Sequence, residues 1–342
     1  MAEMKNRRIV LAARPAGDPA DTDFRLEEID IPSPGDGQVL LRTLYLSLDP
    51  YMRGRMNAGP SYAPPVQIGE VMEGGTVNEV VESKSPQWRP GALVRSYTGW
   101  QEYALAEGSG LERIDPHVAP VSTALGVLGM PGLTAYTGLL NIGQPKAGET
   151  VVVAAASGAV GSVVGQIAKI KGCRAVGVAG SQQKCDFVRT TLGFDACVNH
   201  RSEKFAEELR AACPKGIDVY FENVGGRVLE AMVPLLNLFG RVPVCGLIAH
   251  YSAVALPKGP DHTPLLMSAI LTKRLMFRGF IVMDFASQKA EFERDMAAWL
   301  REGKMKYRED IVDGLENAVP AFRGLLQGQN FGKLLVRVAR QG

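Results

Sequence analysis

The segment TVVVAAASGAVGSVVGQIAK, residues 150–169, contains the pattern that decides the fold. An apolar run typical of a buried strand leads through a turn of small residues into a run typical of a helix. Ala156, Gly158 and Gly161 occupy the GxGxxG register at this turn, and Ala156 replaces the first glycine, which requires a negative φ there. Glycine lets the main chain approach a pyrophosphate closely, and helix N-terminal amides attract its charge. The pattern predicts a dinucleotide-binding turn; the alternative is a glycine-rich turn without a ligand.

The same order of strand and helix repeats as far as GRVPVCGLI, residues 240–248. Apolar, β-branched strands that alternate with helices indicate a parallel sheet covered on both faces. The first 120 residues instead contain short alternating runs separated by PSPGDG and SPQWRPG, which is typical of a β-rich domain. A helix through residues 286–303 and a final strand in GKLLVRVAR are expected after RLMFRGFIV. The predicted fold class is α/β, with a doubly wound parallel sheet and a second, β-rich domain.

Composition restricts the possible functions. A chain of 342 residues, with 46% hydrophobic and 22% charged residues, is typical of a globular protein of about two domains. The net charge of +2 leaves no excess of positive charge for nucleic acid or anionic lipid, so neither is an expected partner. No signal peptide or membrane span is visible, which predicts a cytoplasmic protein. We expect reduced core thiols at the widely spaced cysteines Cys173, Cys185, Cys197, Cys213 and Cys245.

The end of the second strand in the repeat, CRAVGVAG, indicates which dinucleotide is bound. An Asp or Glu at this place binds the ribose hydroxyls of NAD, but here Gly180 and Ser181 are followed by Lys184. Without a carboxylate to repel it, a 2′-phosphate fits beside a cation, so the sequence predicts NADP. The alternatives are a solvated helix charge at Lys184 and a helix N-cap at Ser181. His200 and Arg201, after the third strand, line the same phosphate or form a surface loop.

Two kinds of chemistry lack the residues they need. The first cysteine is Cys173 and the only histidine before it is His117, so we expect neither a catalytic nor a structural zinc site. No GxSxG turn is present to support acyl transfer through an activated serine. Hydride transfer to an activated carbon–carbon double bond is the chemistry that remains favoured.

Further motifs extend over nearly the whole chain. They include LSLDPYMRGRM (46–56), VLGMPGLTAYTGL (127–139), YFENVGG, PVCGLIAHYS and GQNFGKLLVRV. With these motifs the chain resembles the zinc-independent medium-chain dehydrogenase/reductase superfamily, in particular its branch of leukotriene hydroxydehydrogenases, prostaglandin reductases and plant double-bond reductases. The resemblance implies a GroES-like catalytic domain of residues 1–125 and 305–342 and a Rossmann NADP-binding domain of residues 126–304. It also implies an active site between the domains and a homodimer in which strands corresponding to RLMFRGFIV pair.

The same resemblance assigns roles to individual residues. The pyrophosphate is expected at Gly158, Ala159, Val160 and Gly161, and the 2′-phosphate at Lys184. Relatives of the leukotriene type carry Tyr at the position of His200. The residues implied beside the ribose and the nicotinamide are Asn223, Cys245, Gly246, Leu247, Met130, Pro131, Thr134 and Asn330.

Tyr251 matches the active-site tyrosine of the family. A phenol stays protonated at neutral pH, so it can donate to a carbonyl oxygen as negative charge develops there. The implied reaction is conjugate reduction: NADPH delivers hydride to the β-carbon of an enone, and the phenol or water protonates the α-carbon. The alternative for Tyr251 is an aromatic side chain that packs on the loop.

Candidate substrate-binding residues are Tyr51, Tyr62, Met283 and Phe285. Tyr51 is otherwise a core residue, and RLMFRGFIV with the residues after it is otherwise an ordinary half-buried strand. Two other functions stay open: an NADPH-dependent quinone reductase of the same fold, and an NADPH-binding partner protein without catalysis.

Overall fold

The computed structural model describes residues 5–255 and 259–340. The chain leaves one unit at Leu125 and returns to it at Glu309, and the second unit comprises Gly126–Arg308.

The second unit is built around a parallel sheet. Its six strands lie in the order β10-β9-β8-β11-β12-β13, and all five pairings are parallel. The strands are β8 (Thr150–Ala154), β9 (Arg174–Ala179), β10 (Ala196–Asn199), β11 (Ile217–Phe221), β12 (Leu236–Val244) and β13 (Met276–Gly279). The chain runs outward from β8 in one direction and then from β11 in the other. The predicted doubly wound α/β sheet is therefore confirmed.

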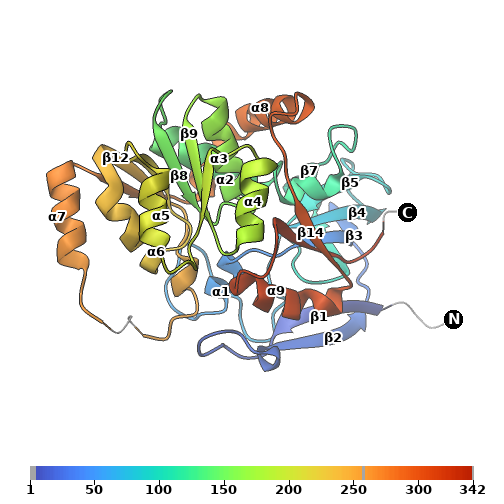
Figure 1. Cartoon of the computed structure of the whole chain (residues 1–342). Coiled ribbons are helices and arrows are strands. Elements are labelled where there is room, and N and C mark those ends of the chain that lie inside the picture. Colours follow the sequence, from blue (N-terminus) through green and yellow to red (C-terminus); the bar gives the residue numbers. More distant parts are fainter. Residues whose placement is uncertain (1–4, 256–258, 341–342) are drawn as a thin grey trace. The chain divides into compact units, whose positions relative to one another are not determined.

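Helices cover both faces of this sheet (Figure 1). Successive strand residues point to opposite faces. Accordingly, Val151 and Val153 pack in one core with α2, α3, α4 and α8, while Val152 and Ala154 pack in another with α5, α6 and α7. The helices are α2 (Met130–Thr137), α3 (Gly161–Ile170), α4 (Gln182–Thr190), α5 (Phe205–Ala212), α6 (Gly226–Met232), α7 (Thr263–Lys273) and α8 (Lys289–Arg301).

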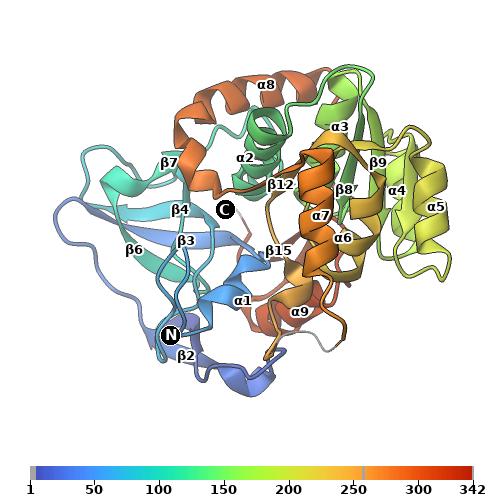
Figure 2. The same ribbon diagram turned by 90° about the vertical axis from the view of Figure 1, so that its left-hand side faces the viewer.

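The first unit is β-rich, as the sequence predicts (Figure 2). A seven-stranded sheet has the order β14-β15-β3-β4-β5-β7, with β6 paired to β3, and β1 pairs with β2 separately. Its elements are β1 (Lys5–Leu11), β2 (Phe24–Asp30), β3 (Gln38–Ser47), α1 (Tyr51–Arg55), β4 (Thr76–Ser83), β5 (Leu93–Ser96), β6 (Tyr103–Glu107), β7 (Glu112–Arg113), β14 (Glu309–Asp313), α9 (Ala318–Leu326) and β15 (Lys333–Arg337). Trp100 stacks on Phe24 and meets Phe322 of α9 edge-on, so the C-terminal segment completes this core.

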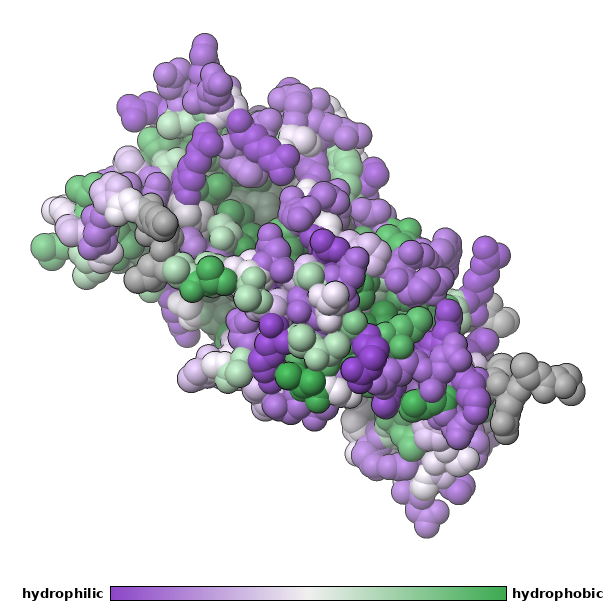
Figure 3. Space-filling view, turned by 90° about the horizontal axis from the view of Figure 1, so that it is seen from below, coloured by the Kyte–Doolittle hydropathy of each residue, from purple (hydrophilic) through white to green (hydrophobic). Residues whose placement is uncertain are grey.

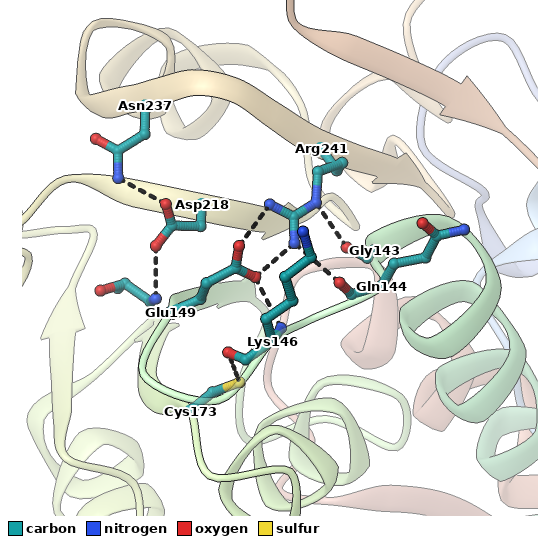
Figure 4. Close-up of polar contacts among 9 residues, drawn as sticks. Gly143, Gln144, Lys146, Glu149, Cys173, Asp218, Asn237 and Arg241 are labelled. Carbon is teal, nitrogen blue, oxygen red and sulfur yellow. Dashed lines mark hydrogen bonds and ion pairs between the residues drawn. The ribbon is translucent and has the colours of Figure 1, made fainter.

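A polar network closes the amino edge of the parallel sheet (Figure 4). The guanidinium of Arg241, at β12, donates to both carboxylate oxygens of Glu149 and to the carbonyls of Gly143 and Gln144. Asp218 of β11 accepts from the first amide of β8 at 2.8 Å. Burial alone would raise the pKa of Glu149, but the hydrogen bonds from Arg241 and from a backbone amide outweigh it and hold that pKa below its ordinary value. Hydrogen bonds and one ion pair thus connect neighbouring strands and loops at this edge.

No helix in the described ranges has the length and apolar character needed to cross a membrane.

Candidate active site

The turn between β8 and α3 lies at the carboxyl edge of the sheet. Ala155 has a φ of +52°, which is strained for a residue with a Cβ, whereas Ala156 keeps the expected negative φ. A Cβ on Gly161 would lie 2.3 Å from the Ala155 carbonyl oxygen, and one on Gly158 would lie 3.2 Å from it. Only glycine at 161 therefore allows the helix to begin so close to the strand.

This turn presents unpaired amides. In the part of the chain that the structure describes, the N–H groups of Ala159, Val160 and Gly161 donate to no protein acceptor. They precede or begin α3, whose ten residues add a partial positive charge at this end. Three adjacent donors at a helix N-terminus are suited to a pyrophosphate.

The end of β9 carries no acid, as the sequence predicts. Ser181 caps α4, because its hydroxyl accepts from the Lys184 amide at 3.3 Å. A Cβ on Gly180 would lie 3.2 Å from His200 Nε2, so glycine leaves room for this imidazole, and 3.8 Å from Arg201 Nε, which is an ordinary contact distance. The predicted N-cap and the predicted cations are therefore found in the same place.

Arg227 joins this group, and sequence reasoning missed it. Its Nη2 donates to the Ser202 carbonyl at 3.0 Å, which fixes the guanidinium on the loop after β10. Burial lowers the pKa of His200 below its ordinary value, and the charges of Arg201, Arg227 and Lys184 lower it further. Arg227 follows ENVGG directly, but the sequence does not show that the start of α6 contacts the loop after β10.

The ENVGG turn after β11 is held by a buried acid. Glu222 Oε1 accepts from the amides of Val224 at 2.5 Å and Gly225 at 2.9 Å, and burial raises the pKa of Glu222. Asn223 donates from Nδ2 to the Ala154 carbonyl at 2.9 Å, so it bridges the ends of β11 and β8. Glu222 was also missed; its one signal is an acid directly after the apolar run IDVYF.

Tyr251 lies over the loop that follows β12. The amides of Cys245 and Gly246 donate to the Glu222 carbonyl at 2.9 and 3.2 Å, which ties this loop to the ENVGG turn. The Leu247 amide donates to the Tyr251 hydroxyl at 3.3 Å, and a Cβ on Gly246 would lie only 2.8 Å from that oxygen. An amide that donates to a phenol oxygen makes its O–H a stronger donor. The candidate acid therefore stands among the loop residues predicted to contact the cofactor.

Cys245 does not offer a thiolate here. Burial and the neighbouring charge of Glu222 raise the pKa of Cys245 to about 12. The thiol stays protonated at neutral pH, and all five cysteines of the chain are free.

Other predicted residues of the second unit lie on α2 and after β13. Pro131 and Thr134 are buried, and the Thr134 hydroxyl donates to the Met130 carbonyl at 2.8 Å. Phe285 meets Phe280 edge-on with ring centroids 6.1 Å apart, which places it against the core. Met283 is 61% exposed.

Tyr51 and Tyr62 belong to the first unit, where Arg55 joins them. The Arg55 guanidinium carbon lies 4.2 Å from the Tyr62 ring centroid and 5.9 Å from that of Tyr51. Arg55 is buried, forms an ion pair with Glu73 at 2.9 Å, and was missed by sequence reasoning. Burial raises the pKa of Tyr51. The structure thus adds a cation to the predicted aromatic pair.

Asn330 also belongs to the first unit. It donates from Nδ2 to the Gly332 carbonyl at 2.8 Å, just before β15.

Comparison with known proteins identifies the family. Residues 7–114 match a family described as the N-terminal domain of oxidoreductase, and residues 159–302 match zinc-binding dehydrogenase. The chain is 58% identical to the NADPH-dependent curcumin reductase of Escherichia coli, over 98% of each chain. It is 42% identical to prostaglandin reductase 1 of Oryctolagus cuniculus, over 93% of this chain and 89% of that one. The crystal structure of CurA from Vibrio vulnificus in complex with NADPH superimposes with a TM-score of 0.94 at 55% identity, covering 98% of this chain and 99% of the other.

The chain belongs to the medium-chain dehydrogenase/reductase superfamily. Within the superfamily it belongs to the prostaglandin reductase branch.

This superfamily member lacks the ligands that one family description implies. The description of residues 159–302 names zinc, yet no cysteine precedes Cys173 and only His117 precedes it among the histidines. Among residues 5–255 and 259–340, no three His, Cys, Asp or Glu side chains form a group that could hold a metal ion. The donor set does not fit zinc, and no step of the chemistry is assigned to a metal.

Proposed function

We propose that the protein is an NADPH-dependent reductase of the carbon–carbon double bond of α,β-unsaturated ketones and aldehydes. The observation that carries the proposal is the carboxyl edge of the parallel sheet. Unpaired amides follow β8, residues 180–184 after β9 include a lysine but no Asp or Glu, and a phenol follows β12. A dinucleotide phosphate fits the first two features, and the third suits a carbonyl oxygen that gains negative charge. The sequence similarity to curcumin reductase and prostaglandin reductase supports the same chemistry.

The residues at this edge fit NADPH. The amides of residues 159–161 would hold the pyrophosphate, since they face no protein acceptor in the described part of the chain. Lys184, with His200 and Arg201, would hold the 2′-phosphate, and Arg227 adds positive charge there. NAD-binding folds carry an Asp or Glu at the end of the second strand. Residues 180–184 contain neither, so no carboxylate there repels the 2′-phosphate.

Tyr251 is the proposed catalytic residue. When bound, NADPH supplies the hydride for the β-carbon of the substrate. Tyr251 donates to the carbonyl oxygen of the substrate, and the Leu247 amide, 3.3 Å from the phenol oxygen, strengthens that donation. The proton for the α-carbon comes from Tyr251 or from water.

The remaining site residues keep their predicted roles in this proposal. Asn223, Cys245, Gly246 and Leu247 contact the ribose and nicotinamide, together with Met130, Pro131, Thr134 and Asn330. Tyr51, Tyr62, Met283 and Phe285 contact the substrate. We also propose that the first unit is the GroES-like catalytic domain and the second the NADP-binding domain. The cytoplasmic location stays a prediction.

The proposed assembly is a homodimer through the edge of the parallel sheet. β13 is the last strand of that sheet in the described chain, and Met276 within it is 38% exposed. Beside it α7 contains no buried residue, and its Leu265 and Leu271 are 70% and 76% exposed. At the left end of Figure 3, on the side where Figure 1 places α7, green atoms lie exposed among paler and purple ones. An unpaired edge and an apolar helix are typical of a subunit interface. A molar mass of one chain by light scattering in solution would contradict the homodimer.

Oxidation of NADPH at 340 nm tests the proposed function. Curcumin, a simple alkenal and a quinone are assayed in parallel, each with NADPH and with NADH. Enone-dependent oxidation that prefers NADPH is expected. Turnover of the quinone alone would assign a quinone reductase instead, and NADPH binding without any oxidation would assign a non-catalytic partner protein.

A further inference from the structure

His200 lies within a cluster of cations contributed by separate elements. Lys184 comes from α4, Arg201 from the loop after β10, and Arg227 from α6. All three charges act on the imidazole of His200. Two carboxylates lie nearby: Glu203 is exposed in the same loop, and Glu208 of α5 accepts from the Ser202 hydroxyl at 2.8 Å. Besides burial, the groups that lower the pKa of His200 are these three cations.

The position of the imidazole is set by the backbone around it. The His200 amide donates to the Ala179 carbonyl at 3.0 Å, which continues the pairing of β10 with β9. His200 Nε2 would lie 3.2 Å from a Cβ on Gly180, and Arg201 Nε would lie 3.8 Å from the same point. Both groups thus lie near the glycine that follows β9, the place where the sequence predicts the 2′-phosphate.

We propose that His200 takes up a proton when NADPH binds, so that the preference for NADPH over NADH increases as the pH falls. Because this inference rests on the proposed function, it applies to the 2′-phosphate at this cluster. Without the phosphate, burial and the three cations keep the imidazole neutral at pH 7, since they lower the pKa of His200. A phosphate monoester carries about 1.5 to 2 negative charges at pH 7 and offsets that repulsion. The imidazolium is then favoured.

Linkage gives the size of the effect. Each unit by which binding raises the pKa of a group strengthens binding by about tenfold at low pH. Between pH 8.0 and 6.5 we expect the dissociation constant of NADPH to fall by about threefold to tenfold. That of NADH, which has a hydroxyl in place of the phosphate, should change by less than about twofold. Below about pH 6 the phosphate itself takes a proton and the gain stops.

Isothermal titration calorimetry of the full chain tests the proton uptake directly. NADPH and NADH are each titrated at pH 7.0 in two buffers of different ionisation enthalpy, and the difference in heat gives the protons taken up. The variants are His200→Gln, which removes the titrating group, and His200→Lys, which makes the charge permanent. His117→Gln, at an exposed histidine of the first unit, is the matched control.

We expect the wild type to take up protons when it binds NADPH and none when it binds NADH. This proton uptake should be lost in both His200 variants and kept in His117→Gln. His200→Lys should also bind NADPH at pH 8.0 as tightly as at pH 6.5. Any proton that the phosphate releases on binding is released in all variants. The difference in proton uptake between the wild type and a His200 variant therefore reports on His200 alone. If circular dichroism shows that His200→Gln does not fold, the proton uptake of His200→Lys, compared with that of the wild type, tests the inference.

Uptake that persists in a folded His200 variant would overturn this inference. Equal uptake with NADPH and NADH would do the same. A protein that binds NADPH no more tightly than NADH at any pH would instead contradict the proposed cofactor. A protein that prefers NADPH and reduces enones without proton uptake would lose this inference alone.

Discussion

The two edges of the parallel sheet are built from the same strands but differ in how their polar groups are used. At the amino edge, Arg241 and Glu149 satisfy one another and nearby carbonyls. At the carboxyl edge, three adjacent amides lack a protein acceptor in the described chain, and cations lie near His200. Unpaired donors and neighbouring like charges lower the stability of the fold unless a ligand accepts the hydrogen bonds and neutralises the charge. The amino edge therefore stabilises the fold, and the carboxyl edge is arranged for an anion.

Breaking the amino edge should have the largest effect on stability and little on binding. Arg241→Met removes the donor to a part-buried carboxylate and to two carbonyls, since the side chains of Arg241 and Glu149 are 17% and 21% exposed. We expect a loss of about 3 kcal/mol in the free energy of unfolding, measured with urea at pH 7. The KM for NADPH should not change. Arg294→Met, in an exposed ion pair, is the control and should leave the free energy of unfolding nearly unchanged.

The pH dependence of that loss checks its cause. The pKa of Glu149 is lower in the folded protein than in the unfolded chain. Its contribution is therefore present above the unfolded pKa of about 4.3 and is lost as the pH falls through the folded pKa. The difference between wild type and Arg241→Met should narrow below about pH 4. A difference that is constant with pH would assign the loss to packing alone.

Removing the phenol at the carboxyl edge should lower turnover strongly and stability only slightly. Tyr251→Phe deletes the proposed donor to the carbonyl oxygen, and loss of one such donor lowers kcat by about 100-fold. The urea midpoint should fall only slightly, because the phenol oxygen accepts one hydrogen bond from the amide of Leu247, which is itself 37% exposed. Tyr307→Phe, at a tyrosine of the second unit outside the proposed site, should keep its kcat. If Tyr251→Phe turned over at the wild-type rate, a ribose hydroxyl or water would suffice as donor.

Removing one cation after β9 should change cofactor preference more modestly. Lys184→Ala should raise the KM for NADPH by about tenfold and that for NADH by less than about twofold, because only NADPH has the 2′-phosphate. Lys171→Ala, at the exposed end of α3, is the control and should change neither. Equal increases for both cofactors would rule out a phosphate contact at Lys184.

The features that were predictable from the sequence are local ones. The strand–turn–helix fingerprint, the acid-free end of β9 and the alternation of strands with helices all appear within short windows. Arg227 and Glu222 were missed, since their roles depend on which strand ends meet in the folded sheet. The helix α7 was missed because its own apolar residues are distributed around all of its faces. Its sequence therefore shows no amphipathic period.

The smallest expected effect compares backbone strain at the two edges. Gln144 at the amino edge and Ala155 at the carboxyl edge both have positive φ, +44° and +52°. Glycine at either position relieves strain of about 1–2 kcal/mol but adds about 0.5–1 kcal/mol of unfolded-state entropy, so each variant should gain at most about 1 kcal/mol. Only Ala155→Gly should also weaken NADPH binding, by about twofold to threefold, because the Ala155 strain holds the amides after it in place. Equal NADPH affinity in both variants would mean that Gly158 and Gly161, rather than the strained alanine, set the shape of the turn.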